Sequence, residues 1–90
     1  MEIEFDPKKN QFNIETRGID FNLALEFDLE TALIREDTRR DYKEQRFIAI
    51  GYIKDRLYVL VFTPREAAMR VISLRKANKR ECQLYAKYQS

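Results

Sequence analysis

Histidine and tryptophan are absent from this 90-residue sequence, and cysteine occurs once. Without histidine there can be no nucleophile triad with a histidine base, no histidine-ligated zinc site and no pair of catalytic histidines. The single cysteine, Cys82, cannot form an internal disulfide, which favours a reducing compartment. Two glycines and two prolines provide neither a flexible linker nor a glycine-rich phosphate loop, so nucleotide hydrolysis is not expected.

Long apolar runs are also missing. The longest, Leu57 to Phe62, is far too short to cross a membrane. The first nine positions carry five charged side chains, which a secretory signal would not contain. We therefore expect a cytoplasmic protein, with one domain over residues 1–90 because the chain is too short for two.

Charge is distributed unevenly along the chain. Residues 1–64 carry a net charge of −3 and residues 65–90 a net charge of +5, which together give the net charge of +2. A basic C-terminal third favours a polyanion or an acidic protein segment as a partner. A solvated terminal helix would have the same charges, so that alternative stays open.

The N-terminal third of the sequence predicts one strand and two helices. Ile3 and Phe5 alternate with acidic residues, which is typical of a half-buried strand. Asp6 is placed to cap a helix that ends at Gly18, and Asp20 is placed to cap a second helix.

The remaining strands are predicted in succession, at 32–34, 47–53, 57–62 and 69–74, followed by a helix at 76–88. The near-continuous apolarity of the second and third of these strands is typical of central strands that are covered on both faces. The charged segment 36–44 is predicted to be exposed or a strand end. Strands joined by short turns imply an antiparallel meander, so the fold class is α+β with the order β-α-α-β-β-β-β-α.

The last strand and the last helix together predict a basic groove. Alternation places Val71, Ser73 and Arg75 on one face of the strand. On the helix, a basic stripe that contains Arg80 and Lys87 lies about a quarter turn from the apolar side. The helix can therefore dock on the sheet while its basic stripe borders the gap between them.

Three stretches of the sequence carry a further signal. The first, from Phe5 to Phe21, has an aromatic residue, Asp-Pro, a lysine, an asparagine and a closing glycine: Phe5, Asp6, Pro7, Lys9, Asn13 and Gly18. The second is R-F-I-A-I-G, from Arg46 to Gly51, with the strand that ends at Thr63. The third is R-V-I-S-L-R-K-A-N-K-R-E, from Arg70 to Glu81. In their order and spacing, these stretches resemble the BrnT family, the toxin half of a bacterial type II toxin–antitoxin pair.

The resemblance implies a RelE-like fold, a ribonuclease that binds RNA and arrests growth, and a cognate BrnA-like antitoxin with a ribbon-helix-helix part. DNA would be contacted only through that antitoxin. The sequence departs from the family at three positions: Phe5 replaces the common tryptophan, Arg17 a frequent histidine and Leu74 the usual alanine. Arg17 rules out an imidazole at its position, whereas the other two differences are typical of packing exchanges.

RNA cleavage requires neither histidine nor a metal, because the 2′-OH of RNA can attack the adjacent phosphate. We predict that Arg75 and Arg80 bind the scissile phosphate and that Arg46 supplies a third cation, since guanidinium groups match phosphate oxygens. The flanking RNA backbone is assigned to three lysines: Lys76, Lys79 and, on the strength of the resemblance, Lys9. The general acid and base are left open among four candidates: Glu44, Lys54, Tyr58 and Tyr85.

Two alternatives to this site remain open. Arg46 and Arg75 would be structural if they formed ion pairs with Glu44 and Glu81. The whole domain would be a non-catalytic interaction domain if its basic end bound an acidic protein segment or nucleic acid without turnover.

The acidic residues of the first strand allow a metal site to be considered. Glu2, Glu4 and Asp6 share one strand face, and three carboxylates can hold Mg²⁺. A better explanation of these acidic residues is that their charges prevent another strand from pairing with an exposed edge. We therefore expect metal-independent cleavage and no cofactor.

Overall fold

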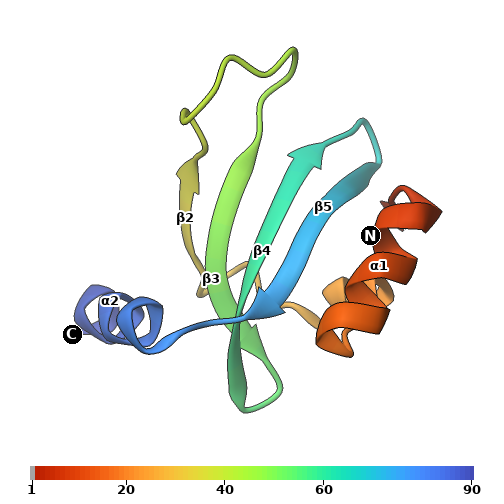
Figure 1. The fold of residues 1–90 in the computed structure, drawn as a ribbon. Coiled ribbons are helices and arrows are strands. Elements are labelled where there is room, and N and C mark those ends of the chain that lie inside the picture. The colour runs from red at the N-terminus through yellow and green to blue at the C-terminus, as the bar shows by residue number, and fades with distance from the viewer. Residues whose placement is uncertain (1) are drawn as a thin grey trace.

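A computed structural model of the chain describes residues 2–90, which form a five-stranded sheet with helices on both sides (Figure 1). In chain order the elements are β1 (Glu2–Glu4), α1 (Pro7–Arg17), the 3₁₀ helix η1 (Phe21–Glu26), β2 (Leu33–Glu36), β3 (Phe47–Ile53), β4 (Arg56–Pro64), β5 (Ala68–Lys76) and α2 (Lys79–Gln89). The α+β class is confirmed. The second predicted helix is only a short 3₁₀ helix, although Asp20 does cap it, accepting a hydrogen bond from the backbone of Asn22. No helix within residues 2–90 is long and apolar enough to span a bilayer.

The sheet has the strand order β1-β5-β4-β3-β2, with β2 at one edge and β1 at the other. The strands β2 to β5 form the predicted antiparallel meander. However, β1 pairs parallel to β5, with Ile3 opposite Met69, so the expectation of a purely antiparallel sheet is wrong. From β1 the chain passes through α1 and η1 to β2, at the far edge of the sheet. The meander then runs back across the sheet, so its last strand, β5, lies next to β1.

An irregularity in β5 changes which side chains share a face. Val61 pairs with Ser73 and Phe62 pairs with Val71, so Ile72 has no opposite residue and forms a bulge. Val71 therefore turns toward the same core as Leu74. The prediction that Val71 shares a face with Ser73 and Arg75 is wrong for this reason.

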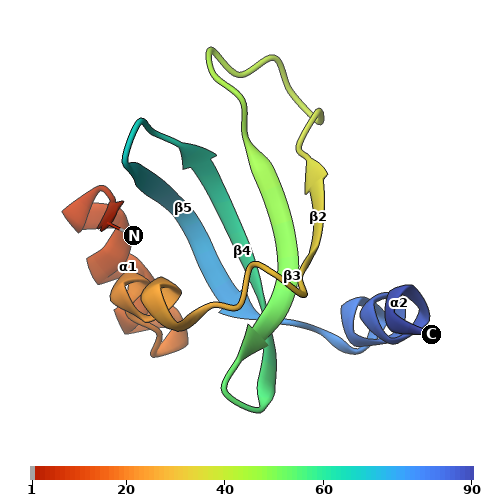
Figure 2. The same ribbon diagram turned by 180° about the vertical axis from the view of Figure 1, so that it is seen from behind.

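Two separate cores hold the helices against the two faces of the sheet. The larger core joins η1 to the sheet and includes Phe21 and Leu60, which are almost fully buried. The smaller core joins α2 to the other face, with Tyr85 packed near Val59. β3 and β4 are thus covered on both faces, as predicted. Figure 2, the view from behind, also places α1 and α2 at opposite sides of the sheet.

Two buried asparagines fix α1 against η1 and β5. The amide nitrogen of Asn13 donates hydrogen bonds to the carbonyl oxygens of Ile19 and Leu74, both at 2.9 Å. Asn10 accepts a hydrogen bond from the backbone N–H of Phe21 at 2.8 Å. These bonds satisfy backbone groups that would otherwise be buried without partners, and the bond to Leu74 ties α1 to the strand that leads to Arg75.

Candidate nucleic-acid interface

A groove of about 570 Å³ lies between α2 and the strands β2 and β3. Half of its lining is aliphatic and half is polar or charged: Leu33, Ile48, Ile50 and Leu84, and Arg35, Asn78, Arg80 and Glu81. This is the gap between sheet and final helix that the sequence predicts.

The first turn of α2 is fixed by a capping box. The side chain of Asn78 accepts a hydrogen bond from the backbone of Glu81 at 2.8 Å, and the Glu81 carboxylate accepts one from the backbone of Asn78 at 2.9 Å. Because Asn78 is the cap, the helix begins at Lys79 rather than at the predicted Lys76. Asn78 and Arg80 both line the groove, so the N-terminal, partly positive end of the helix lies there.

Arg75 connects the end of β5 to this first turn. Its two terminal nitrogens donate to the two carboxylate oxygens of Glu81 at 2.8 and 2.7 Å. The structural ion pair that the sequence left open for Arg75 is therefore formed. Glu81 lines the groove, whereas Arg75 is not among the lining residues and has about a third of its side chain exposed.

The electrostatics of the pair keep both groups charged. The hydrogen bonds from Arg75 hold the pKa of Glu81 below its ordinary value, and the positive charge of Arg35 acts in the same direction. Glu81 in turn raises the pKa of Arg75. Arg35, Arg75 and Arg80 against the one Glu81 leave a formal net charge of +2 around the groove. Such a surface attracts an anion.

Arg35 was missed by the sequence analysis, which ended its strand at Ile34. In the structure β2 continues to Glu36, so Leu33 and Arg35 share a face and both line the groove. Within residues 2–90, neither Arg35 nor Arg80 forms an ion pair closer than 4.0 Å. Extending the predicted strand by one residue, with the alternation that begins at Leu33, would have found Arg35.

Arg46 does not line this groove. Its guanidinium carbon lies 3.8 Å from the centre of the Tyr42 ring, and it borders a hollow of the loop between β2 and β3. Its Nε atom is buried without a hydrogen-bond partner among residues 2–90. Glu44 pairs with Arg65 instead, at 2.7 and 3.1 Å.

The three predicted RNA-binding lysines are all exposed but lie in two places. Lys76 and Lys79 flank the connection from β5 to α2, beside the groove. Lys9 lies on α1 and borders a different hollow, with Asn13 and Ser73. The structure therefore brings Lys9 to a separate surface.

The candidate acids and bases also lie away from the groove lining. Glu44 is engaged by Arg65, and Lys54 sits in the β3–β4 turn, 3.9 Å from Glu26. Tyr58 packs against the larger core, on the opposite face of the sheet. The hydroxyl of Tyr85 donates to the carbonyl oxygen of Thr31 at 3.0 Å.

The segment 36–44, predicted to be an exposed loop or a strand end, begins at the end of β2 but is not wholly exposed. Asp37 is buried, and its carboxylate accepts hydrogen bonds from the Arg39 guanidinium, both at 2.8 Å, and one from the Tyr42 hydroxyl. The Arg39 guanidinium holds the pKa of Asp37 well below its usual range. A charge-dense segment thus contains one buried carboxylate that orders the loop around it.

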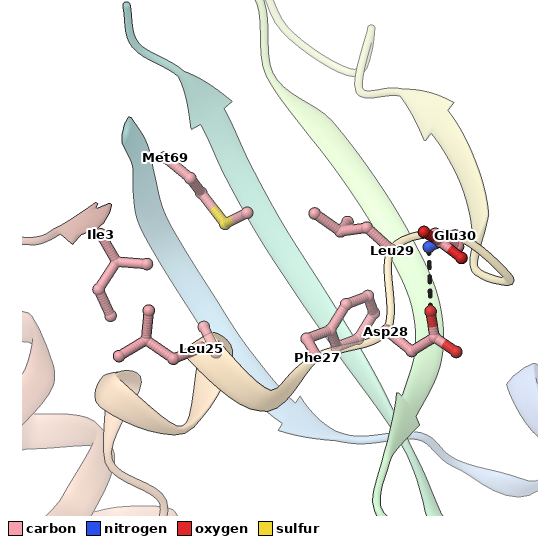
Figure 3. Close-up of a pocket in the computed structure, with 8 residues that line it drawn as sticks. Ile3, Leu25, Phe27, Asp28, Leu29, Glu30 and Met69 are labelled. Atoms are coloured by element: carbon pink, nitrogen blue, oxygen red, sulfur yellow. Dashed lines mark hydrogen bonds between the residues drawn. The ribbon is translucent and has the colours of Figure 1, made fainter. Parts of the chain in front are cut away.

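Another hollow, of about 360 Å³, lies on the other face of the sheet (Figure 3). Figure 3 shows Ile3, Leu25 and Met69 approaching one another across it, with Asp28 and Glu30 toward one end. Its described lining includes two carboxylates and no cation. It is therefore unsuited to a polyanion.

The acidic residues of the N-terminal segment have other roles. Glu4 forms ion pairs with Arg65 at 3.3 Å and with Arg70 at 3.4 Å. Asp6 caps α1, accepting from the backbone of Lys8 at 2.9 Å. In the part of the chain that the structure describes, no three cysteine or acidic side chains are grouped closely enough to hold a metal ion.

We expect acid to weaken the attachment of α2. The folded-state pKa of Glu81 is lowered, so its contribution to stability is present above its ordinary value of 4.5 and is lost as the pH falls below it. Between about pH 7 and about pH 3, the free energy of unfolding measured with urea should therefore fall less in Glu81→Gln than in the wild type. Glu66→Gln, in an exposed turn, is the control. Equal losses in wild type and Glu81→Gln would contradict the role of the pair.

Comparison with known proteins identifies the family to which the chain belongs. No curated protein matches the chain. A family model described as the ribonuclease toxin, BrnT, of type II toxin–antitoxin systems matches residues 5–81. The match ends at Glu81, so it includes β5, Arg75, Arg80 and the cap of α2. The chain belongs to the BrnT family of ribonuclease toxins of type II toxin–antitoxin systems.

Proposed function

We propose that the chain is a metal-independent endoribonuclease with a RelE-like fold, acting in the cytoplasm, and that the α2 groove binds the scissile phosphate. The observation that carries the proposal is the convergence of Arg35 from β2, Arg80 from α2 and the Arg75–Glu81 pair on one groove of net charge +2. A ribbon-helix-helix antitoxin is proposed to neutralise it.

The chemistry assigned to the groove is attack by the RNA itself. The 2′ oxygen forms a bond to phosphorus as the bond from phosphorus to the 5′ oxygen breaks, and the 2′ proton leaves to a base while the 5′ oxygen gains a proton. The products are a 2′,3′-cyclic phosphate and a 5′-hydroxyl end. Negative charge grows on the non-bridging phosphate oxygens in the transition state, and the arginines stabilise it there.

The three arginines contribute differently. Arg80 and Arg35 line the groove and are available to donate to phosphate oxygens. Arg75 is held by Glu81, so it adds positive charge at short range and offsets the negative charge of the carboxylate that lines the groove. Phosphate contacts by Arg75 itself, and RNA contacts by Arg46, Lys76, Lys79 and Lys9, remain predictions.

Cleavage in the presence of a chelator is the test of the proposal. Purified protein should cleave total RNA at the same rate in EDTA as in Mg²⁺, because the charge stabilisation comes from guanidinium groups. The fragments should carry 2′,3′-cyclic phosphate and 5′-hydroxyl ends. Loss of activity in EDTA that Mg²⁺ restores would contradict metal independence, and binding of RNA without any turnover would favour a non-catalytic interaction domain.

A further inference from the structure

Arg46 and Thr63 lie opposite each other at the end of the β3–β4 pair, on the α2 side of the sheet. Phe47 pairs with Phe62, and both pack in the larger core on the other side. Arg46 and Thr63 are the next residues outward, so alternation turns both toward the α2 side. Opposite side chains in an antiparallel pair have Cβ atoms only about 4.5–5.5 Å apart, so these two are within reach of each other.

Both side chains carry a buried polar atom that has no partner. Within residues 2–90, Nε of Arg46 and Oγ1 of Thr63 are the two buried side-chain polar atoms that form no hydrogen bond. Thr63 as a whole is 2% exposed. Folded proteins rarely leave such atoms unpaired, so two of them at adjoining positions indicate one polar function that they share.

Arg46 also keeps its positive charge available. No carboxylate of residues 2–90 lies within 4.0 Å of its guanidinium nitrogens. The ring of Tyr42 lies against the guanidinium and supports it without neutralising it. Arg70, opposite Thr63 on β5, adds a second cation, although one of its nitrogens lies 3.4 Å from Glu4. Guanidinium groups in such a place attract a phosphate.

The α2 groove leads to Arg46 along β3. Ile48 and Ile50 line the groove, and Arg46 follows on the same side of the chain, about 7 Å beyond Ile48. Figure 1 shows the loop between β2 and β3 at the end of the sheet away from α2. A single strand of RNA whose scissile phosphate lies in the groove can therefore place a flanking phosphate at Arg46.

We propose that Arg46, with Arg70 beside it, forms a second phosphate-binding site for RNA, and that the Thr63 hydroxyl accepts the Nε–H of Arg46 when RNA binds. This inference rests on the proposed function, because it takes RNA as the ligand. The bond to Thr63 directs the terminal nitrogens of Arg46 at a phosphate that flanks the scissile one. Thr63 is thus a positioning residue, which acts through Arg46.

The experiment measures RNA affinity as a function of salt concentration. The probe is a fluorescein-labelled 2′-O-methyl RNA oligonucleotide, which cannot be cut through its 2′ oxygen. Thr63→Val removes the hydroxyl and no charge, and it should weaken binding about fivefold at about 0.1 M salt. The slope of log K against log salt concentration should become shallower by about 0.7, the change expected for one lost phosphate contact on a single strand. Thr63→Ser should bind like the wild type. Thr16→Val, which removes an exposed hydroxyl from α1, is the matched control and should change neither quantity.

Two further measurements separate positioning from a structural role. In an Arg46→Gln background, Thr63→Val should cause no further loss of affinity, because the hydroxyl acts only through that guanidinium. The free energy of unfolding of Thr63→Val should not fall, because the hydroxyl has no partner within residues 2–90 to lose.

Wild-type affinity and salt slope in a folded Thr63→Val variant would overturn the proposal. Thr63→Ser that binds as weakly as Thr63→Val, or an undiminished effect of Thr63→Val in the Arg46→Gln background, would overturn the positioning role. If Thr63→Val does not fold, Arg46→Gln decides, and an effect no larger than that of Lys87→Ala overturns the site. Binding is read directly, so these losses without any RNA cleavage would count against the proposed function alone. A wild-type protein that does not bind RNA would overturn both.

Discussion

Replacing Arg80 by alanine should slow RNA cleavage by roughly 30- to 1000-fold, which corresponds to about 2–4 kcal/mol of lost transition-state stabilisation. Arg80 lines the groove, and it forms no ion pair closer than 4.0 Å within residues 2–90. Its removal therefore takes a cation from the phosphate without breaking a contact that holds the fold. Single-turnover cleavage of an RNA oligonucleotide measures the effect, and thermal unfolding should show an unchanged midpoint.

The matched control is Lys87→Ala, which removes an exposed positive charge from the last turn of the same helix. It changes the net charge of the protein by the same amount, so it corrects for general electrostatic attraction of RNA. An Arg80→Ala rate equal to that of the wild type would remove Arg80 from the mechanism. Equal losses in the two variants would mean that net charge, rather than the groove, controls the rate.

Replacing Asn13 by alanine should lower the free energy of unfolding by about 2–4 kcal/mol. Its amide nitrogen satisfies the buried carbonyl oxygens of Ile19 and Leu74, and its oxygen accepts from Arg17 at 2.8 Å. Alanine would leave both carbonyl groups without that donor, which is more costly than the loss of an exposed hydrogen bond. Urea denaturation followed by circular dichroism measures the change.

Gln11→Ala provides the comparison on the exposed side of α1. Gln11 donates to Glu15 at 3.0 Å in an exposed position, so its loss should cost less than about 0.5 kcal/mol. Similar values for the two variants would show that the buried bonds of Asn13 do not anchor α1 to β5. The asparagine would then have no structural reason to lie at this position.

Local chemistry made much of the fold predictable. Asp6 and Gly18 set the ends of α1, because one satisfies a free backbone N–H and the other adopts the left-handed conformation with a φ of 70°. The apolar runs of β3 and β4 identified a hairpin that is covered on both faces. The amphipathic pattern of the last helix predicted a groove with Arg80 at its border.

Features that depend on contacts between distant segments were not predictable in the same way. The parallel pairing of β1 with β5 joins Ile3 to Met69, and no local pattern records it. The bulge at Ile72 adds one residue to β5, so the side chains on either side of it no longer follow a simple alternation between the two faces of the sheet. Asp37 is buried because the surrounding loop supplies its donors, whereas its composition alone suggests exposure.

Mapping where RNA binds is the most direct test of the groove assignment. In an NMR titration with a 2′-O-methyl RNA oligonucleotide, the largest backbone amide shifts should fall on residues that line the groove, including Arg35, Arg80, Glu81 and Leu84. Largest shifts on α1 around Lys9, or in the loop around Arg46, with the groove unperturbed, would contradict the account.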